Sequence, residues 1–460
     1  MPPASSREYI TEKIRQINQL HVFDNWDDLT LLQKERVFRQ IERLDSKFFL
    51  YLRRLLTQGK SVRNFEPPSD FVLVGSDGDY CSLGNRLLQE KKVACIVLAG
   101  GQGSRLKYDA PKGFFPVSPV KKKSLFQLIA EKTKSASKWA NQDLPLAFMV
   151  SPLNADKIVS YFRDNDYFGL NPSQVDFFCQ PLWPLLDGSG NLFFEECDKI
   201  AFGPNGNGCV AKNLFQSPIY GKWREMGVEM ASIIPIDNPL GLPFDADLFG
   251  FHNKHRNDVT IKASFRQTPK ENVGILARQP ETGKTIVIEY FEISDEQRFS
   301  LNSEETLTYP IANIGLYCLS MDFIKKVHHV QLPIYKNKKS AKIWNRNCDD
   351  KNQSKIIDSW KFEEFVFDLF TFADKCGTLV YPRAECFAPL KNLEGNDSLI
   401  TVHQALSQRE RQLFQDLTGV ELSPNATFEL DADFYYPSAL NSVHQWRKKA
   451  FFEESFIEAL

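Results

Sequence analysis

The chain has no long hydrophobic run and no excess of charge of one sign. Its 460 residues contain no apolar stretch of about 18 residues, so no transmembrane helix is expected. The first six residues, Met-Pro-Pro-Ala-Ser-Ser, lack the apolar core of a secretion signal, which predicts a cytoplasmic protein. Lysine and arginine number 56 against 58 aspartates and glutamates, so neither a nucleic acid polymer nor a membrane is an expected partner. An anionic ligand would have to be bound by a local group of cations.

Cysteine pairs at metal-binding or redox spacing are also absent. The nine cysteines are scattered and form no Cys-x-x-Cys motif. We predict reduced thiols that pack as small apolar groups, with no disulfide and no cysteine-bound metal. The length exceeds what one core usually supports, and the composition suggests three segments: helical residues 1–90, an α/β segment over 91–395, and a small α+β segment over 396–460.

Strand and helix patterns alternate from Val93 onward. Short apolar runs bounded by turn formers predict strands at Val93–Leu98, Leu144–Val150, Val175–Cys179 and Val228–Ile236. Helical patterns separate them, which predicts an α/β fold with a doubly wound, mostly parallel sheet. Further strands are predicted between 259 and 320, one of them over Thr285–Ile293, and a short strand-like stretch is predicted at Ala426–Phe434. An amphipathic helix is predicted over Trp360–Ala373.

A glycine-rich loop follows the first of these strands. Its glycines are Gly100, Gly101 and Gly103. They allow a sharp turn that brings backbone N–H groups close to an anion, and Arg105 and Lys112 then add two permanent cations. A tight βα turn would explain the glycines alone, but the cations favour a polyphosphate site. The dinucleotide fingerprint is disfavoured because Leu106 occupies its third glycine position, and the ATPase phosphate loop because Gly113 follows Lys112.

Polar residues stand at the ends of three other predicted strands. Ser151 follows Met149 and Val150, Gln180 ends the next strand, and Asp237 ends a third. Ligands of a doubly wound sheet bind beyond the carboxyl ends of its strands. We therefore expect these side chains to gather beside the glycine loop. A carboxylate at such a place suits Mg²⁺ that bridges phosphate oxygens.

These motifs resemble a known family. Leu98-Ala-Gly-Gly-Gln-Gly-Ser-Arg-Leu106, followed by Pro111-Lys-Gly113, is similar to the signature of the eukaryotic-type UDP-sugar pyrophosphorylases. The Gln-Gly-x-Arg-Leu form is most similar to the UDP-N-acetylglucosamine pyrophosphorylase branch. The resemblance extends over roughly residues 20–400 and implies a Rossmann-like sheet of the GT-A nucleotidyltransferase type, with an N-terminal helical segment and a small C-terminal domain.

The resemblance also implies roles for individual residues. Nucleotide contacts are implied for Leu98, Ala99, Gly100, Gly101, Gly103, Met149, Ser151, Gln180 and Gly206. Sugar contacts are implied for Asn207, Gly208, Glu289 and Asn313. Arg105, Lys112 and Lys391 would face phosphates, and Asp237 would hold Mg²⁺, with Mn²⁺ as the alternative.

The chain departs from the family pattern near the implied sugar residues. Asn205 replaces an aspartate, Cys209 a glycine and Ile314 a histidine. Glucose 1-phosphate therefore stays an alternative to N-acetylglucosamine 1-phosphate. The family also has a phosphate-facing lysine in the stretch that here contains Lys336, Lys338 and Lys339, although a run of surface lysines is more often simply solvated.

The implied reaction converts UTP and a hexose 1-phosphate into a UDP-sugar and pyrophosphate. The attacking phosphate oxygen is already ionised, so the chemistry requires charge neutralisation and alignment and no general base. A nucleotide-binding regulator without turnover is a second reading, and a nicotinamide dehydrogenase is disfavoured by Leu106. The C-terminal segment is a candidate for self-association into a homo-oligomer.

Overall fold

The computed structural model describes residues 4–59, 63–68, 70–76, 78–344, 355–423, 427–436 and 454–458. These residues form two compact units. The first combines residues 1–62, 181–209 and 332–365, and the second combines 63–180, 210–331 and 366–460. Each unit joins stretches far apart in the sequence, whereas the three predicted segments follow the order of the chain.

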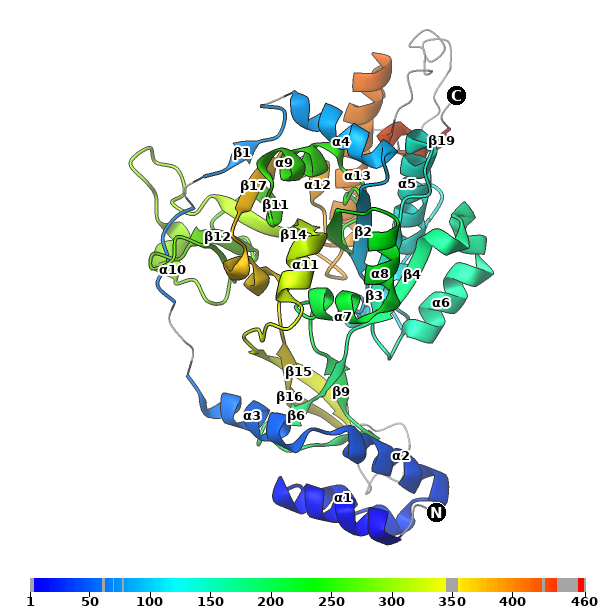
Figure 1. The fold of residues 1–460 in the computed structure, drawn as a ribbon, viewed down its shortest axis with the longest axis vertical. Coiled ribbons are helices and arrows are strands. Elements are labelled where there is room, and N and C mark those ends of the chain that lie inside the picture. Colours follow the sequence, from blue (N-terminus) through cyan, green and yellow to red (C-terminus); the bar gives the residue numbers. More distant parts are fainter. Residues whose placement is uncertain are drawn as a thin grey trace. The chain divides into compact units, whose positions relative to one another are not determined.

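A mixed sheet forms the centre of the second unit (Figure 1). Its strands run in the order β1 (Val72–Leu73), β17 (Cys376–Tyr381), β11 (Val259–Phe265), β14 (Ile311–Ser320), β10 (Met230–Pro235), β2 (Val93–Leu98), β3 (Leu146–Val150) and β4 (Val175–Cys179). Neighbours are parallel except at β14, which is antiparallel to both β10 and β11. The expectation of an α/β fold with a mostly parallel central sheet is confirmed.

The central strands are buried because helices pack against the sheet. Every residue of β3 is buried, as the continuous apolar run predicts for a strand inside a parallel sheet. The helix α5 (Leu125–Ala140) begins at Ser124, whose side chain accepts a hydrogen bond from the Gln127 N–H. Phe126 of α5 packs at 5.3 Å from the rings of both Phe148 in β3 and Phe162 in α6 (Ala155–Asp164).

Two further strands extend the sheet beside β14. The strand β12 (Gly274–Arg278) pairs with β14 and with β13 (Thr285–Ile288), antiparallel in both cases. Strands were predicted here, but the one that begins at Thr285 ends at Ile288 rather than at Ile293. The residues that follow turn back on themselves, and the N–H groups of Glu292 and Ile293 donate to the carbonyl of Glu289.

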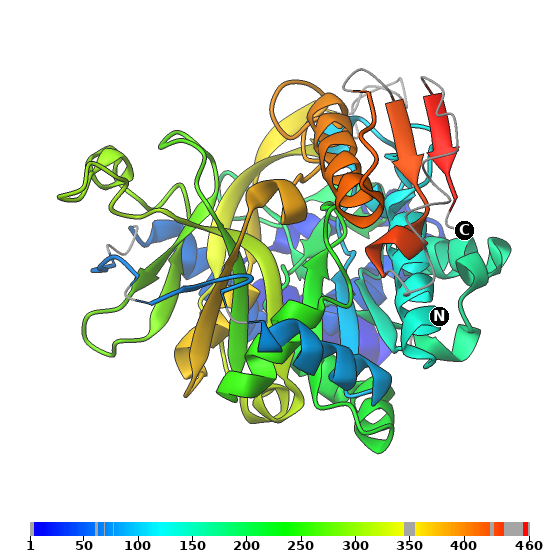
Figure 2. The same ribbon diagram turned by 90° about the horizontal axis from the view of Figure 1, so that it is seen from above.

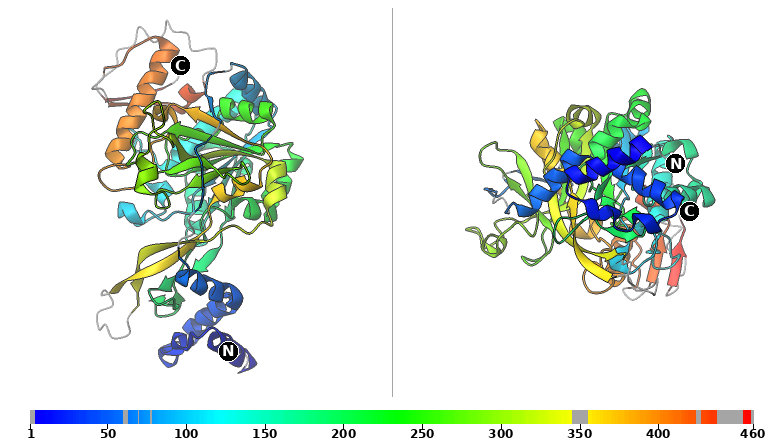
Figure 3. Two further views of the ribbon diagram at one scale, coloured as in Figure 1. Left: turned by 90° about the vertical axis from the view of Figure 1, so that its left-hand side faces the viewer. Right: turned by 90° about the horizontal axis from the view of Figure 1, so that it is seen from below.

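The described part of the first unit includes α-helices from the N-terminal region and a long hairpin (Figure 3). The helices are α1 (Ala4–Gln16), α2 (Leu31–Arg43) and α3 (Ser46–Thr57), and the hairpin pairs β15 (Tyr335–Ile343) with β16 (Lys355–Glu363). The predicted helix over Trp360–Ala373 is wrong, because its first part belongs to β16 and Val366–Phe372 in the second unit is a 3₁₀ helix. Trp360 and Phe362 pack in one hydrophobic cluster, which is the two-residue period of a strand.

The described C-terminal part of the second unit includes a helix and two short strands. The helix α13 (Leu399–Thr418) is followed by β18 (Thr427–Leu430), which pairs in parallel with β19 (Glu454–Ile457), as Figure 2 shows. The predicted strand at Ala426–Phe434 is found as β18 and a 3₁₀ turn, with Ala426 itself outside the described residues. Among the helices described, none combines the length and apolarity needed to cross a bilayer. The eight cysteines in the described ranges are free thiols.

Candidate active site

A lysine, an aspartate and a second lysine meet at the end of β10. The Lys112 Nζ lies 2.8 Å from Oδ2 of Asp237, the second residue after the strand. The Leu390 N–H donates to the Asp237 carbonyl at 2.8 Å, which brings the adjacent Lys391 to the same place. Lys112 thus contacts Asp237 directly, and Lys391 lies close enough to act on the same carboxylate, so the three residues lie together as the sequence predicts.

The charges around Asp237 keep this carboxylate ionised. Burial alone would raise the pKa of Asp237, but Lys112 and then Lys391 and Arg105 act against it, and the net result is a lowered pKa. Arg105, in a 3₁₀ turn (Ser104–Leu106) after the glycine loop, is thus close enough to act on the same carboxylate. Arg105 is exposed, so its guanidinium is accessible to a ligand.

Lys391 is held loosely on two sides. Its Nζ lies 3.8 Å from Oδ2 of Asp397 and 5.6 Å from the centre of the Phe387 ring. Its backbone N–H donates to the carbonyl of Asp397 at 2.7 Å. The cations of Lys112, Lys391 and Arg105 thus all act on the carboxylate of Asp237. A local group of cations of this kind suits a polyphosphate.

The implied nucleotide residues adjoin one another at the ends of β2, β3 and β4. The Ala99 N–H donates to the Met149 carbonyl at 2.8 Å, so the loop that begins with Leu98 starts directly beside β3. A Cβ built on Gly100 would lie 1.8 Å from Nε2 of Gln180, which shows how closely that side chain approaches the loop. Met149 and Gln180 are buried. The strand ends gather as predicted for a parallel sheet.

Ser151 and the loop are connected through Asn154, a residue that the sequence analysis did not single out. The Oδ1 of Asn154 accepts from the Ser151 N–H at 2.9 Å, and its Nδ2 donates to the Ala99 carbonyl at 3.4 Å. Lys112 is connected to the same loop, because its N–H donates to the Gly101 carbonyl at 3.4 Å. The buried Asn154 therefore joins the start of the glycine loop to the end of β3.

Two implied sugar residues, Asn313 and Glu289, lie on either side of Gly274. Asn313 in β14 pairs with Gly274 in β12, and a Cβ on Gly274 would lie 3.0 Å from Oε1 of Glu289. Burial, and after it the charge of Glu292, raise the pKa of Glu289 to about 7, while Lys391 opposes the shift. Glu289 and Asn313 are both partly exposed, so a hydroxylated ligand can reach them.

The second glycine-rich loop belongs to the first unit. The Gly208 N–H donates to the Glu364 carbonyl at 2.9 Å, and a Cβ on either Gly206 or Gly208 would collide with Glu364. These glycines are thus required where two stretches of backbone approach each other closely. Two of the three departures from the family pattern are in contact, because the Cys209 Sγ donates to Oδ1 of Asn205 at 3.3 Å. The roles of Gly206, Asn207 and Gly208 in ligand binding stay predictions.

The lysine cluster on β15 has structural partners within the first unit. The Lys336 Nζ donates to the carbonyls of Leu55 and Gln58 at 2.7 Å each, at the C-terminus of α3. Cations at this end of a helix are stabilised by its dipole. The Lys338 Nζ lies 5.3 Å from the Trp360 ring centre. A phosphate contact by Lys336, Lys338 or Lys339 stays a prediction.

Asn238, next to Asp237, fixes the segment that carries Lys391. Its Nδ2 donates to the Cys386 carbonyl at 2.7 Å, and its Oδ1 accepts from the Ala388 N–H at 3.0 Å. The side chain is fully buried, so both bonds are shielded from water. The sequence offered only its position after Asp237 as a signal, because its partners lie some 150 residues further along the chain.

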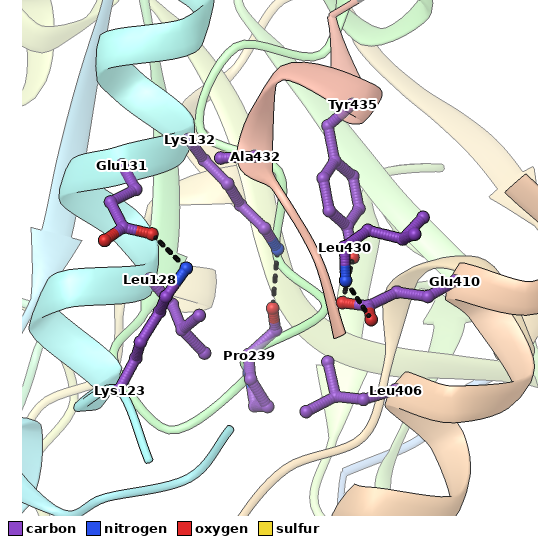
Figure 4. Close-up of a pocket in the computed structure, with 10 residues that line it drawn as sticks. All are labelled: Lys123, Leu128, Glu131, Lys132, Pro239, Leu406, Glu410, Leu430, Ala432 and Tyr435. Atoms are coloured by element: carbon purple, nitrogen blue, oxygen red, sulfur yellow. Dashed lines mark hydrogen bonds and ion pairs between the residues drawn. The ribbon is translucent and has the colours of Figure 1, made fainter. Parts of the chain in front are cut away.

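A buried polar network lies behind the Asp237 loop (Figure 4). The Lys132 Nζ donates to the Pro239 carbonyl at 2.7 Å and lies 4.5 Å from the centre of the Tyr435 ring. The Tyr435 hydroxyl donates to Oε1 of Glu410 at 3.2 Å, and the Leu430 N–H donates to Oε2 at 3.0 Å. Helix α13 and the segment after β18 thereby support the turn that follows Asp237.

Glu410 makes the stability of this network depend on pH. Burial raises the pKa of Glu410 to about 7 from an ordinary 4.5, so the folded chain holds its proton more tightly than the unfolded chain does. The stabilisation by protonated Glu410 is full below pH 4.5 and is lost as the pH rises through 7. Glutamine does not titrate, so the Glu410→Gln variant should not lose this stabilisation when the pH is raised. We therefore expect its free energy of unfolding, measured relative to that of wild type, to increase by about 2 to 3 kcal/mol from pH 5 to pH 8.

Urea denaturation of both proteins at the two pH values measures this change. The exposed Glu421, beyond the end of α13, provides the control variant Glu421→Gln. The control should differ from wild type by the same amount at both pH values. A Glu410→Gln variant that behaves like the control would contradict the prediction.

The described residues include no group of three or more His, Cys, Asp or Glu side chains able to hold a metal ion by themselves. Asp237 alone nevertheless fits Mg²⁺, since that ion commonly binds one or two carboxylates and takes its other ligands from water and substrate phosphates. The carboxylate stays ionised and has cations on its other sides, where phosphates would also bind. A metal at Asp237 would therefore need the nucleotide as a second source of ligands.

Comparisons with known proteins agree with the motifs. A model of the family described as UTP--glucose-1-phosphate uridylyltransferase matches residues 51–441. A protein of Schizosaccharomyces pombe named "Probable UDP-N-acetylglucosamine pyrophosphorylase" is 31% identical over 401 residues, which cover 82% of this chain and 84% of that protein. The UDP-N-acetylglucosamine pyrophosphorylase of Saccharomyces cerevisiae is 27% identical over 464 residues, which cover 95% and 96%.

A solved structure extends the agreement to the fold. The uridine diphosphate N-acetylglucosamine pyrophosphorylase of Trypanosoma brucei, crystallised with an inhibitor, superposes with a TM-score of 0.79 over 99% of both chains at 23% identity. The family suggested by the glycine loop is thus confirmed by a match that also spans both glycine loops, Asp237 and Lys391. The chain belongs to the UTP--glucose-1-phosphate uridylyltransferase family, that is, to the UDP-sugar pyrophosphorylases.

Proposed function

We propose that the protein is a uridylyltransferase that forms UDP-N-acetylglucosamine and pyrophosphate from UTP and N-acetylglucosamine 1-phosphate. The observation that carries this proposal is the contact of Lys112 with Asp237 beside Lys391, at the end of β10. Family membership supports the reaction type, and the names of the relatives at 27 to 31% identity support the sugar.

The reaction exchanges one phosphate bond for another. An ionised oxygen of the sugar phosphate attacks the α-phosphorus of UTP, and the bond from that phosphorus to the bridging oxygen of the β-phosphate breaks. Pyrophosphate leaves with the electron pair of that bond. No proton needs to be removed from the nucleophile, so the main barrier is the repulsion between two anions.

Each cation then has a distinct task in lowering this repulsion. Lys112 binds the α-phosphate and the leaving group, Lys391 binds the incoming sugar phosphate, and Arg105 binds the outer phosphates together with the loop N–H groups. Fixed charges of this kind are effective because they need no reorganisation during the reaction. Asp237 holds Lys112 at 2.8 Å and thereby sets the position of its Nζ before the substrates arrive.

A magnesium ion, or Mn²⁺ in its place, is part of the proposal. Asp237 would hold it, and when bound it would neutralise phosphate charge. The finer description of the fold as a GT-A nucleotidyltransferase sheet with a helical leader and a C-terminal domain belongs to the proposal too. A cytoplasmic location and self-association through the C-terminal residues stay predictions.

Glucose 1-phosphate is the second candidate substrate, because Cys209 and Ile314 depart from the family pattern. We expect kcat/KM for N-acetylglucosamine 1-phosphate to exceed that for glucose 1-phosphate by about tenfold or more, since a site that binds an acetamido group loses those contacts with glucose. A pyrophosphate-release assay with UTP and each sugar phosphate in turn measures the ratio.

The result separates three functions. A ratio below one would make the chain a UTP–glucose-1-phosphate uridylyltransferase. UTP binding without pyrophosphate release from either sugar would identify the nucleotide-binding regulator instead. The cations at Lys112, Lys391 and Arg105 disfavour that last outcome, because a regulator needs the nucleotide site but no cation for the incoming phosphate.

A further inference from the structure

Strand β14 contains a bulge beside the candidate active site. Its pairing with β11 shifts register between Lys262 and Ala263, where positions 314 and 315 of β14 are extra. Gly315 has φ +77°, which favours glycine. In a regular strand, residues four apart are separated by about 13 Å along its axis. The bulge shortens that separation and brings the side chains of Asn313 and Tyr317 together.

The hydroxyl of Tyr317 determines how the Asn313 amide is oriented. It donates a hydrogen bond to Oδ1 of Asn313 at 2.8 Å. The tyrosine ring is buried and packs edge-on against Phe370, with ring centres 5.0 Å apart. Burial raises the pKa of Tyr317, so the hydroxyl keeps its proton and remains a donor. Because the amide oxygen is engaged, the amide nitrogen with its two N–H groups is directed elsewhere.

We propose that Tyr317 is a positioning residue that makes Asn313 present N–H donors to the sugar, so that this side of the site selects an acceptor oxygen. This inference rests on the proposed function and adds a specificity determinant to it. The acceptor would be a hydroxyl or acetamido carbonyl oxygen of the hexose. Glu289, on the other side of Gly274, offers an acceptor when ionised. The two side chains then recognise opposite hydrogen-bonding roles on one sugar edge.

The orientation matters because of the charge of Glu289. If the Asn313 amide were rotated by half a turn, its oxygen would point into the site together with the carboxylate of Glu289. Two acceptors would then face the sugar, and an oxygen that has no proton to donate would be left without a partner. The bond from Tyr317 disfavours this rotation, because a rotated amide could no longer accept the proton of the buried hydroxyl. The position of the Asn313 backbone is set separately by its strand pairing.

A double-mutant cycle with Tyr317→Phe and Asn313→Ala tests the proposal. Phenylalanine retains the packing on Phe370 and removes only the hydroxyl. We expect Tyr317→Phe to raise the KM for N-acetylglucosamine 1-phosphate about 5- to 10-fold, with kcat and the KM for UTP within about twofold of wild type. In the Asn313→Ala background, the same change should alter the KM by less than about twofold, because the group that Tyr317 orients is absent.

Tyr381→Phe is the matched control. The Tyr381 hydroxyl is also buried in the central sheet and donates to Oδ1 of Asp245 at 3.2 Å. Removing the Tyr381 hydroxyl should lower the melting temperature about as much as removing the Tyr317 hydroxyl, but it should leave the KM for the sugar phosphate unchanged. Equal KM effects in the two variants, or additive effects of Tyr317→Phe and Asn313→Ala, would overturn the positioning role.

Wild-type turnover separates this inference from the proposed function. If the wild-type protein releases no pyrophosphate with any hexose 1-phosphate, the proposed function fails. The cycle is then read from calorimetric dissociation constants for UDP-N-acetylglucosamine. The same non-additive pattern there would support the role of Tyr317, and no binding by the wild-type protein would overturn it.

Discussion

Replacing Lys112 with alanine is expected to lower kcat/KM for UDP-sugar formation by about 10²- to 10³-fold, the typical cost of losing one fixed donor to a developing charge. The Lys112 Nζ contacts Asp237 and is the strongest of the three cations that lower the pKa of that carboxyl. Its removal leaves the repulsion between the two anionic substrates less well compensated. Most of the loss should appear in kcat, because the charge shifts toward the leaving group during the reaction.

Two further variants make the result specific to Lys112. Lys107→Ala removes an exposed lysine from the same loop and should leave kcat/KM within about threefold of wild type, as expected for general electrostatic attraction. Lys112→Arg keeps the charge but changes its shape, so partial activity is expected. Near-native turnover by Lys112→Ala at an unchanged melting temperature would refute the role given to this lysine.

The sequence was sufficient to predict which strand ends lie together at the candidate site. The strands β3, β4 and β10 are short, mainly apolar runs, and the polar residue beyond each one marks where it ends. Parallel strands bring such ends to one edge of a sheet, so Gln180 and Asp237 could be expected near the glycine loop without knowledge of the contacts. The contact between Asp237 and Lys112 agrees with that rule.

The connections that hold these residues in place could not be predicted. Asn238 supports the Lys391 segment through Cys386 and Ala388, and this pairing depends on how the chain returns to the sheet far along the sequence. The contact of Tyr317 with Asn313 depends on a bulge that arises from pairing with β11. The local pattern of apolar and polar residues predicts neither the Asn238 bonds nor the Tyr317–Asn313 contact.

The predicted helix over Trp360–Ala373 failed for a related reason. Its apolar residues fit a helical period, but Lys355–Glu363 pairs with β15 along its whole length. Within a strand, the burial of Trp360 and Phe362 on one face follows from their spacing of two residues. Strand pairing at long range therefore outweighed the local pattern.

Asp237→Asn is expected to lower kcat by about 10²- to 10³-fold while leaving UTP binding as tight as in the wild type or tighter. Asparagine has the same shape but no charge, so the Mg²⁺ that we propose at Asp237 would lose a carboxylate ligand. The apparent metal affinity should then fall about 10- to 100-fold, like other losses around metal sites. Lys112, released from its ion pair at 2.8 Å, is then free to bind phosphate, which is why nucleotide binding should not weaken.

The measurements that check this prediction are kcat as a function of Mg²⁺ concentration and the calorimetric affinity for UTP. Asp109→Asn, which neutralises an exposed carboxylate in the loop between Arg105 and Lys112, is the control and should change neither. If kcat falls but its dependence on Mg²⁺ is that of the wild type, Asp237 acts by aligning Lys112 and not by holding the metal. If UTP affinity falls together with kcat, the Asp237 carboxylate is needed to form the nucleotide site. The assignment of nucleotide binding to the cations and of metal binding to Asp237 would then be wrong.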